Sequence, residues 1–189
     1  MATDNDNLAA KLELRRHFLK TYHADGKARV FDCCQGSAVI WTKLRSEHPI
    51  ASYWGVDMKP KAGRLKIDSV RVLEQPGWRE DVIDVDTYGA PWKHWLAILR
   101  NAKGPTTVFL TLGQHGAGGG MTAMQNVVRD TLALPPSTPP MLAAKVAYLA
   151  TDRMLAKALP RWRIEECLEA PPGERARYIG VRISPESCC

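Results

Sequence analysis

One stretch near the start of the chain, residues 28–41, constrains the fold more than any other part of the sequence. It reads ARVFDCCQGSAVIW: an apolar segment that ends in Asp32, a turn that contains Gly36, and the beginning of a helix. The next apolar segment, Tyr53–Asp57, also ends in an aspartate. A strand, a tight glycine turn and a helix, followed by a carboxylate at the end of the second strand, are typical of a nucleotide-binding α/β half.

Strands and helices alternate along most of the chain, and this alternation predicts a mainly parallel sheet. The expected strands are residues 29–32, 53–57, 65–68, 81–86, 106–112, 162–169 and 177–184, and helices are expected from Ser37, Ser69 and Pro91. Only a short Pro-Pro-Gly turn separates the last two strands, so they must pair antiparallel. The predicted fold class is therefore α/β: a three-layer, Rossmann-like sheet, mostly parallel, with a C-terminal antiparallel hairpin.

A length of 189 residues suits a single domain covering residues 1–189. Apolar residues at near-helical spacing predict a helix within residues 1–24, which we expect to pack against the edge of the domain. The glycine- and proline-rich segment 113–140 is expected to be flexible. A long helix over residues 141–159 should follow it and end at Pro160.

The composition excludes several classes of protein. The chain has no apolar run near the roughly 20 residues that a membrane span needs, so no membrane partner is expected. Its polar, acidic N-terminus is not a secretory signal, and we expect a cytoplasmic protein. The odd count of five cysteines, without metal-ligand spacing, argues against a disulfide framework and a zinc site. A net charge of +6 fits an RNA or DNA substrate, and it fits a basic soluble enzyme almost as well.

At residues 32–38, which read DCCQGSA, and at Asp57 the chain resembles the class I, Rossmann-like, S-adenosylmethionine-dependent methyltransferases. The resemblance implies S-adenosylmethionine as cofactor, with Asp32 beneath it and Gly36 as the middle glycine of its loop. Cys34 and Ala38 stand where the family has its outer glycines. In that family a closing hairpin distinguishes the sheet from a plain dinucleotide-binding fold.

The same resemblance assigns three further cofactor residues, each with a structural alternative. Asp57 would bind the ribose hydroxyls, or cap the turn that follows its strand. Met58 would lie against the adenine ring, or be an ordinary apolar loop residue. Asp68 would hold the adenine amino group, or cap the helix that begins at Ser69. Cys33, like Cys34, lacks a histidine–acid pair and is expected to be a small buried residue rather than a nucleophile.

Residues 84–92, which read DVDTYGAPW, form a second motif at the end of the fourth expected strand. They are similar to the Asp-Pro-Tyr/Phe-Gly-Ser-Pro turn of tRNA guanine dimethyltransferases, with Thr87 and Ala90 at two of its positions. This similarity implies catalytic roles: Asp86 accepts a hydrogen bond from the substrate amine, Tyr88 stacks on or positions the substrate, and Pro91 stiffens the turn. The alternative for Asp84 and Asp86 is a pair of strand-end carboxylates that face the solvent.

These observations predict an S-adenosylmethionine-dependent methyltransferase that acts on a nitrogen of a nucleic-acid substrate. Three alternatives stay open: a methyltransferase for a small molecule or protein, a nicotinamide-dependent oxidoreductase, and a non-catalytic, methyltransferase-like binding subunit. An oxidoreductase should have more glycines in the first turn. His115, in the glycine-rich segment, is a general base, a substrate contact or an exposed loop residue.

Overall fold

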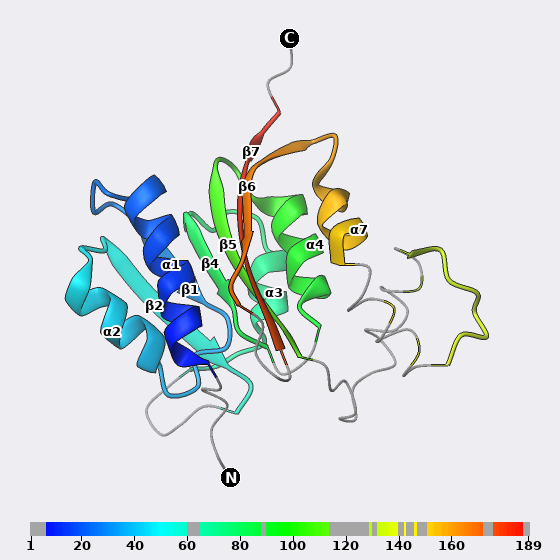
Figure 1. Cartoon of the computed structure of the whole chain (residues 1–189), viewed down its shortest axis with the longest axis horizontal. Helices are drawn as coiled ribbons and strands as arrows, with labels where there is room; N and C mark the ends of the chain where they lie inside the picture. Colours follow the sequence, from blue (N-terminus) through cyan, green and yellow to red (C-terminus); the bar gives the residue numbers. More distant parts are fainter. Residues whose placement is uncertain are drawn as a thin grey trace.

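The computed structural model describes residues 7–59, 65–87, 90–113, 129, 132–139, 142, 146, 151–171 and 176–186. In this part of the chain a seven-stranded sheet has the order β3-β2-β1-β4-β5-β7-β6 (Figure 1). The strands are β1 (Arg29–Asp32), β2 (Ser52–Asp57), β3 (Leu65–Lys66), β4 (Val82–Val85), β5 (Thr106–Gly113), β6 (Trp162–Glu169) and β7 (Ala176–Pro185). Strands β1 to β5 pair in parallel, and β7 pairs antiparallel with both β5 and β6. The predicted fold class is confirmed.

Helices cover both faces of this sheet (Figure 1). Helices α1 (Leu8–Tyr22) and α2 (Val39–Glu47) pack on one face. Helices α3 (Ser69–Glu74), α4 (Trp92–Asn101) and α7 (Thr151–Leu155) pack on the other, and a single 3₁₀ turn, η1 (Ala156–Ala158), follows α7. The two faces therefore have separate hydrophobic cores, joined only through the sheet.

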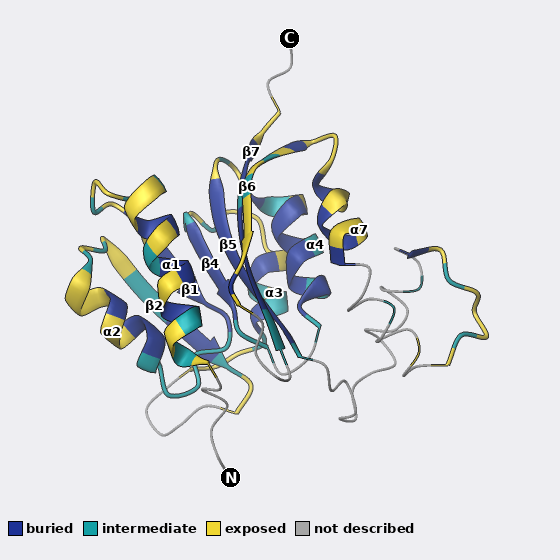
Figure 2. Ribbon diagram, in the orientation of Figure 1, coloured by how far each residue is buried: buried dark blue, intermediate teal, exposed yellow. Residues whose placement is uncertain are grey.

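The central strands divide their side chains between the two cores because successive residues of a strand point to opposite faces. In β1, Val30 packs beneath α1 and α2, whereas Phe31 packs toward α4. Strand β5 is buried on both faces over most of its length (Figure 2), as its continuous apolar sequence predicts. The central strands thus form a rigid base for the residues at their carboxyl ends.

Helix α1 lies across the face of the sheet, and the prediction that it packs against the domain edge is wrong. Phe18 meets Phe109 of β5 edge to face, with the ring centroids 5.6 Å apart. Beneath the same ring, β7 has Gly180, where a Cβ atom would lie 2.5 Å from the phenylalanine side chain. The helix can approach this closely because β7 presents no side chain there.

The remaining predictions are tested only in part. Of the helix expected over residues 141–159, Leu142 and Val146 are described and helical, the chain is described continuously from Thr151, and the α-helical part ends at Leu155 rather than Leu159. Much of the segment 113–140, expected to be flexible, lies outside the described residues, and so does His115. Among the helices that the structure describes, none combines the length and the apolar character needed to cross a membrane.

Candidate functional site

The candidate site lies where β1, β2 and β4 end at the same edge of the sheet. Parallel strands place their carboxyl ends together, and open α/β sheets bind their ligands at this edge. Here it gathers Asp32 from β1, Asp57 from β2 and Asp86, directly after β4. The structure therefore brings together the acids of both motifs.

The loop between β1 and α2 is a tight turn that backbone hydrogen bonds tie to β2. The amide of Gln35 donates to the carbonyl of Val56 (2.9 Å), and the amide of Ala38 donates to the carbonyl of Gln35 (2.6 Å). Gly36 has a φ of 47° and Ala38 a φ of 56°, both in the left-handed region. Glycine takes this conformation without strain, so the alanine is strained at this position.

Asp57 joins this loop to the end of β2. One carboxylate oxygen accepts a hydrogen bond from the amide of Gly36 (2.9 Å), and the other accepts one from the amide of Lys59 (2.7 Å). The structural alternative, a strand-end carboxylate that caps the following turn, is therefore realised. Each oxygen keeps a free lone pair, so Asp57 can also accept two hydroxyl groups of a ligand.

Asp32 lies beneath the loop with 4% of its surface exposed. Its carboxylate accepts a hydrogen bond from the hydroxyl of Tyr53 (2.9 Å) and a longer one from the amide of Cys34 (3.3 Å). Burial, followed by the charge of neighbouring Asp84, raises the pKa of Asp32 to about 8. This acid is therefore far easier to protonate than an ordinary aspartate.

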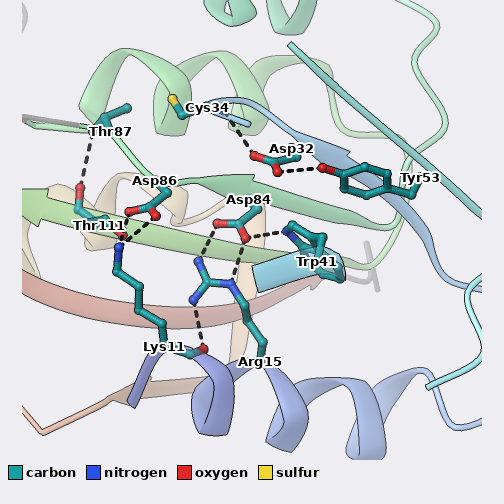
Figure 3. Close-up of polar contacts among 10 residues, drawn as sticks. All are labelled: Lys11, Arg15, Asp32, Cys34, Trp41, Tyr53, Asp84, Asp86, Thr87 and Thr111. Atoms are coloured by element: carbon teal, nitrogen blue, oxygen red, sulfur yellow. Dashed lines mark hydrogen bonds and ion pairs between the residues drawn. The ribbon is translucent and has the colours of Figure 1, made fainter. Parts of the chain in front are cut away.

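Asp84 forms a buried ion pair with Arg15 of α1 (Figure 3). The guanidinium donates two hydrogen bonds, at 2.7 and 2.6 Å, and the indole N–H of Trp41 donates a third at 2.7 Å. Burial works against the charge of Arg15, but Asp84 more than offsets it and raises the pKa of the guanidinium. Asp84 is 2% exposed, so the interpretation of this residue as a carboxylate facing solvent is wrong.

Asp86, 22% exposed, is held by Lys11 of α1. The ammonium group lies 2.9 and 2.8 Å from the two carboxylate oxygens, and it sits 5.0 Å from the centre of the Tyr178 ring. Lys11 is only 3% exposed, which is rare for a lysine. Asp86 therefore faces the site from a fixed position, with one lone pair still available on each oxygen.

Lys11 and Arg15 were missed as site residues by the sequence analysis. The buried residues of α1 form one stripe along the helix, with spacings of three and four residues. Lys11 and Arg15 belong to this stripe together with the apolar residues. A charged residue within an apolar stripe must have a buried partner. Their position on the stripe was the signal that could have revealed them.

The other predicted residues surround this centre. Met58 is 58% exposed at the end of β2. Asp68 caps α3 by accepting a hydrogen bond from the amide of Val70 (3.0 Å), so its structural role is present. Pro91 is the capping residue of α4, and its carbonyl accepts the amide of Trp95 at 3.0 Å. Tyr88 lies outside the described residues.

The cysteines of the loop have no feature of a nucleophile. Burial raises the pKa of the Cys33 and Cys34 thiols well above their ordinary value, so both stay protonated at neutral pH. Within the described ranges, no group of three or more histidine, cysteine or acidic side chains could hold a metal ion. The described side chains at this edge offer hydrogen bonding and charge.

Solved structures of methyltransferases share this architecture. Trm1 from Pyrococcus horikoshii, in a complex with S-adenosyl-L-methionine, superposes with a TM-score of 0.65 at 16% identity, covering 97% of this chain and 56% of Trm1. TYW2 from M. jannaschii, in complex with AdoMet, has a TM-score of 0.55 at 8% identity, covering 98% and 79%. This chain has the class I methyltransferase fold.

The plantazolicin methyltransferase BamL, solved with SAH, shares the same fold: its TM-score is 0.55 at 11% identity, and the superposition covers 97% of this chain and 88% of BamL. The chain spans little more than half of the length of Trm1. No protein-family model matches the sequence, and no curated protein matches it either. The similarity therefore concerns the fold, and it assigns no role to an individual residue of this chain.

Proposed function

We propose that this protein is an S-adenosylmethionine-dependent methyltransferase. The observation that carries the proposal is the placement of Asp32 and Asp57 at the carboxyl ends of the adjacent parallel strands β1 and β2, with the Gly36 amide bonded to Asp57. A loop that approaches a ligand with its backbone, and a carboxylate that can take up a ribose diol, are what an adenosyl ligand requires.

The residues present fit this cofactor. Gly36 leaves the centre of the loop open, since a Cβ atom there would meet only the carbonyl of Cys34, at 3.8 Å. Asp57 has the two free lone pairs that two ribose hydroxyls need, and exposed Met58 offers an apolar surface for adenine. Asp32 supplies a buried carboxylate for the positively charged part of the molecule. One glycine and no pyrophosphate cradle make a dinucleotide a poorer fit.

When bound, S-adenosylmethionine supplies a methyl group that is already activated by its sulfonium. The protein then has to orient the acceptor and exclude water. We assign the orientation to Asp86, which accepts a hydrogen bond from the acceptor amine. The residues on either side of the next turn are anchored: the Thr87 hydroxyl donates to the carbonyl of Thr111 (3.3 Å), and Pro91 is the N-terminal capping residue of α4. Tyr88, between these anchors, is proposed to stack on the acceptor.

We further propose that the acceptor is a nitrogen atom of a nucleic acid and that the protein acts in the cytoplasm. Two observations support this substrate class: the net charge of +6, and the similarity of residues 86–91 to the turn of tRNA guanine dimethyltransferases. Small-molecule and protein acceptors remain the competing classes, and a non-catalytic binding subunit is the competing role.

Calorimetric titration tests the cofactor. The purified chain is titrated with S-adenosylhomocysteine and, in parallel, with NAD. We expect binding of the former alone, weakened roughly tenfold or more in Asp57→Asn because a carboxamide keeps only one acceptor oxygen for the hydroxyls and the loop. Asp81→Asn is the matched control. Asp81 also accepts a hydrogen bond from a backbone amide, that of Arg29, but it lies at the opposite end of β4. The affinity of this variant for S-adenosylhomocysteine should therefore equal that of the wild-type protein.

Transfer of a labelled methyl group tests the acceptor. Pools of RNA, DNA, protein and small metabolites are incubated with the enzyme and the labelled cofactor. Label in RNA or DNA supports the proposed class, and label in protein or metabolites alone overturns it. Binding of NAD alone would instead indicate an oxidoreductase. If neither ligand binds a folded sample, the enzyme assignment fails and a binding subunit becomes the better description.

A further inference from the structure

Three carboxylates lie on the same face of the sheet at its centre (Figure 3). Asp84 and Asp86 point to this face because they alternate along the end of β4. Asp32 of β1 is the register partner of Asp84, which places these two acids side by side. Asp84 and Asp86 are bonded to cations of α1, and Asp32 and Asp84 are almost fully buried.

Helix α1 neutralises two of these acids and leaves the third. Arg15 bonds to both oxygens of Asp84, and Lys11 bonds to both oxygens of Asp86. The hydrogen bonds to Asp32 come from the Tyr53 hydroxyl and the Cys34 amide, which are both uncharged. In the part of the chain that the structure describes, no lysine, arginine or histidine bonds to Asp32.

The other groups that face Asp32 do not supply the missing charge. Tyr53 also accepts a hydrogen bond from the Gln35 amide group (3.1 Å), and Arg45 of α2 lies over the ring of Tyr53 rather than at its hydroxyl. The charged and titratable groups around Asp32 are, by element, Arg15 and Lys11 of α1, Cys33 and Cys34 of the loop, Arg45 of α2, Tyr53 and Asp57 of β2, and Asp84 and Asp86 of β4. The nearby cations are therefore engaged elsewhere, and one buried carboxyl group has no cation bonded to it among the described residues.

We propose that Asp32 makes this site selective for a positively charged ligand, and that binding of such a ligand drives the proton of Asp32 into solvent. The step is a simple ionisation: the carboxylic acid O–H bond breaks, the carboxylate stays against the ligand, and the proton goes to the buffer. The ligand class is a cation, and the inference rests on the proposed function in taking it to be S-adenosylmethionine, which has a sulfonium and an ammonium group.

The titration of Asp32 agrees with this geometry. With the pKa raised to about 8, the acid is mostly protonated in the free protein at neutral pH. An opposite charge that arrives within the site favours the ionised form and lowers the pKa. Because the ligand prefers the ionised acid, its affinity should rise with pH until the free protein is itself ionised, by roughly tenfold per pH unit at most.

Calorimetry in buffers of different protonation enthalpy measures the released proton directly. Three ligands are compared: S-adenosylmethionine, S-adenosylhomocysteine, which keeps the ammonium group alone, and methylthioadenosine, which has neither cation. At about pH 7 we expect S-adenosylmethionine to release a large fraction of a proton on binding. S-adenosylhomocysteine should release the same fraction or less, and methylthioadenosine should release none. The dissociation constant of S-adenosylmethionine should tighten from about pH 6 to about pH 8 and level off above that range.

Asp32→Asn is the diagnostic variant, with Asp81→Asn as its control. The carboxamide has no proton to lose, so its proton release and pH dependence should fall to the small contribution of the ligand's own amine, while methylthioadenosine still binds. Should the variant fail to fold, the carboxyl titration of Asp32 in the wild-type protein, followed by carbon NMR, replaces it. A midpoint near an ordinary aspartate's value would overturn the proposal.

The outcomes separate this inference from the proposed function. Binding of S-adenosylmethionine without proton release, or with the same affinity at every pH, overturns the role of Asp32 and leaves the methyltransferase assignment intact. Absence of binding by all three ligands overturns both. Binding with proton release that persists in Asp32→Asn assigns the proton to another group and also refutes the inference.

Discussion

Arg15 and Asp84 form a fully buried ion pair that joins α1 to the centre of the sheet, with both partners at most 2% exposed. The carboxylate also accepts the indole N–H of Trp41, so a single acid ties α1, α2 and β4 together. The first helix is thus part of the central structure, although it precedes the first strand by several residues and shares no hydrogen bond of the sheet.

Removal of Arg15 should be the most destabilising single change in this network. Arg15→Met leaves the Asp84 carboxylate buried without a counter-charge, at an expected cost of about 3–5 kcal/mol in the free energy of unfolding. Chemical denaturation at neutral pH measures it. Arg16→Met is the control, since Arg16 pairs with Glu47 on the exposed side of the same helix and should change stability little. Equal losses in the two variants would contradict the buried pairing.

If the proposed function holds, Lys11→Met should impair methyl transfer to the acceptor while leaving cofactor binding nearly unchanged. Without the ammonium group, Asp86 is no longer fixed, so we expect methyl transfer to fall at least about tenfold while the affinity for S-adenosylhomocysteine changes less than about twofold. Lys11→Arg, which keeps the charge, should restore part of the transfer. A parallel loss of cofactor affinity in Lys11→Met would place its effect on the cofactor side instead.

The loop between β1 and α2 should become more stable through Ala38→Gly. Ala38 has a φ of 56°, and a left-handed conformation costs a residue with a Cβ atom about 1 kcal/mol more than it costs glycine. The reciprocal change, Gly36→Ala, should destabilise by a similar amount because Gly36 has a φ of 47°. Thermal melts of both variants check the opposite signs; the same sign in both would refute the backbone argument.

Gly180→Ala should weaken the packing of α1 on β7. The new methyl group would lie 2.5 Å from the Phe18 ring, so either the ring or the helix must move, at a cost of about 1–3 kcal/mol. Gly104→Ala is the matched control, since a Cβ atom there meets nothing within 4 Å. Phe18→Leu combined with Gly180→Ala should recover part of the loss. Unfolding midpoints of the wild-type protein, Gly180→Ala, Gly104→Ala and the double variant test this.

His94 should make the protein less stable in mild acid. Burial lowers the pKa of His94 to about 4, and one ring nitrogen contacts the hydroxyl of Ser69 at 2.8 Å. Between about pH 4 and the ordinary histidine value of about 6.5, the unfolded chain binds more protons than the folded one, so stability falls as the pH falls through this range. Stability curves of His94→Gln should have a shallower slope there. His23, with its pKa also lowered to about 4, contributes in the same direction, whereas the raised pKa of Asp32 contributes a slope of opposite sign.

The alternation of strands and helices could be predicted because it depends on local periodicity. Strand β5 is a run of apolar residues and threonines, and Asp32 and Asp57 end short apolar segments whose length and following turns are typical of strands. Once the strands are parallel, their carboxyl ends share one edge, so the gathering of these acids with Asp86 also followed from the order of elements.

The partners of the acids could not be predicted in the same way. Lys11 and Arg15 belong to a helix whose position over β4 depends on the fit of Phe18 against Gly180, a contact between opposite ends of the chain. The interpretation of Asp84 as solvent-facing was wrong for this reason: nothing in its neighbourhood in the sequence indicates an arginine from α1.

The sequence by itself determined the order of the elements, the edge at which ligands are expected, and the acids at that edge, because periodicity and strand ends are local properties of the chain. Only the tertiary structure decided how these acids differ. Asp84 and Asp86 each receive a cation from α1, and Asp32 receives uncharged donors alone. The charge of a buried carboxylate depends on its depth and on the groups that surround it, and here those groups come from segments distant in the sequence.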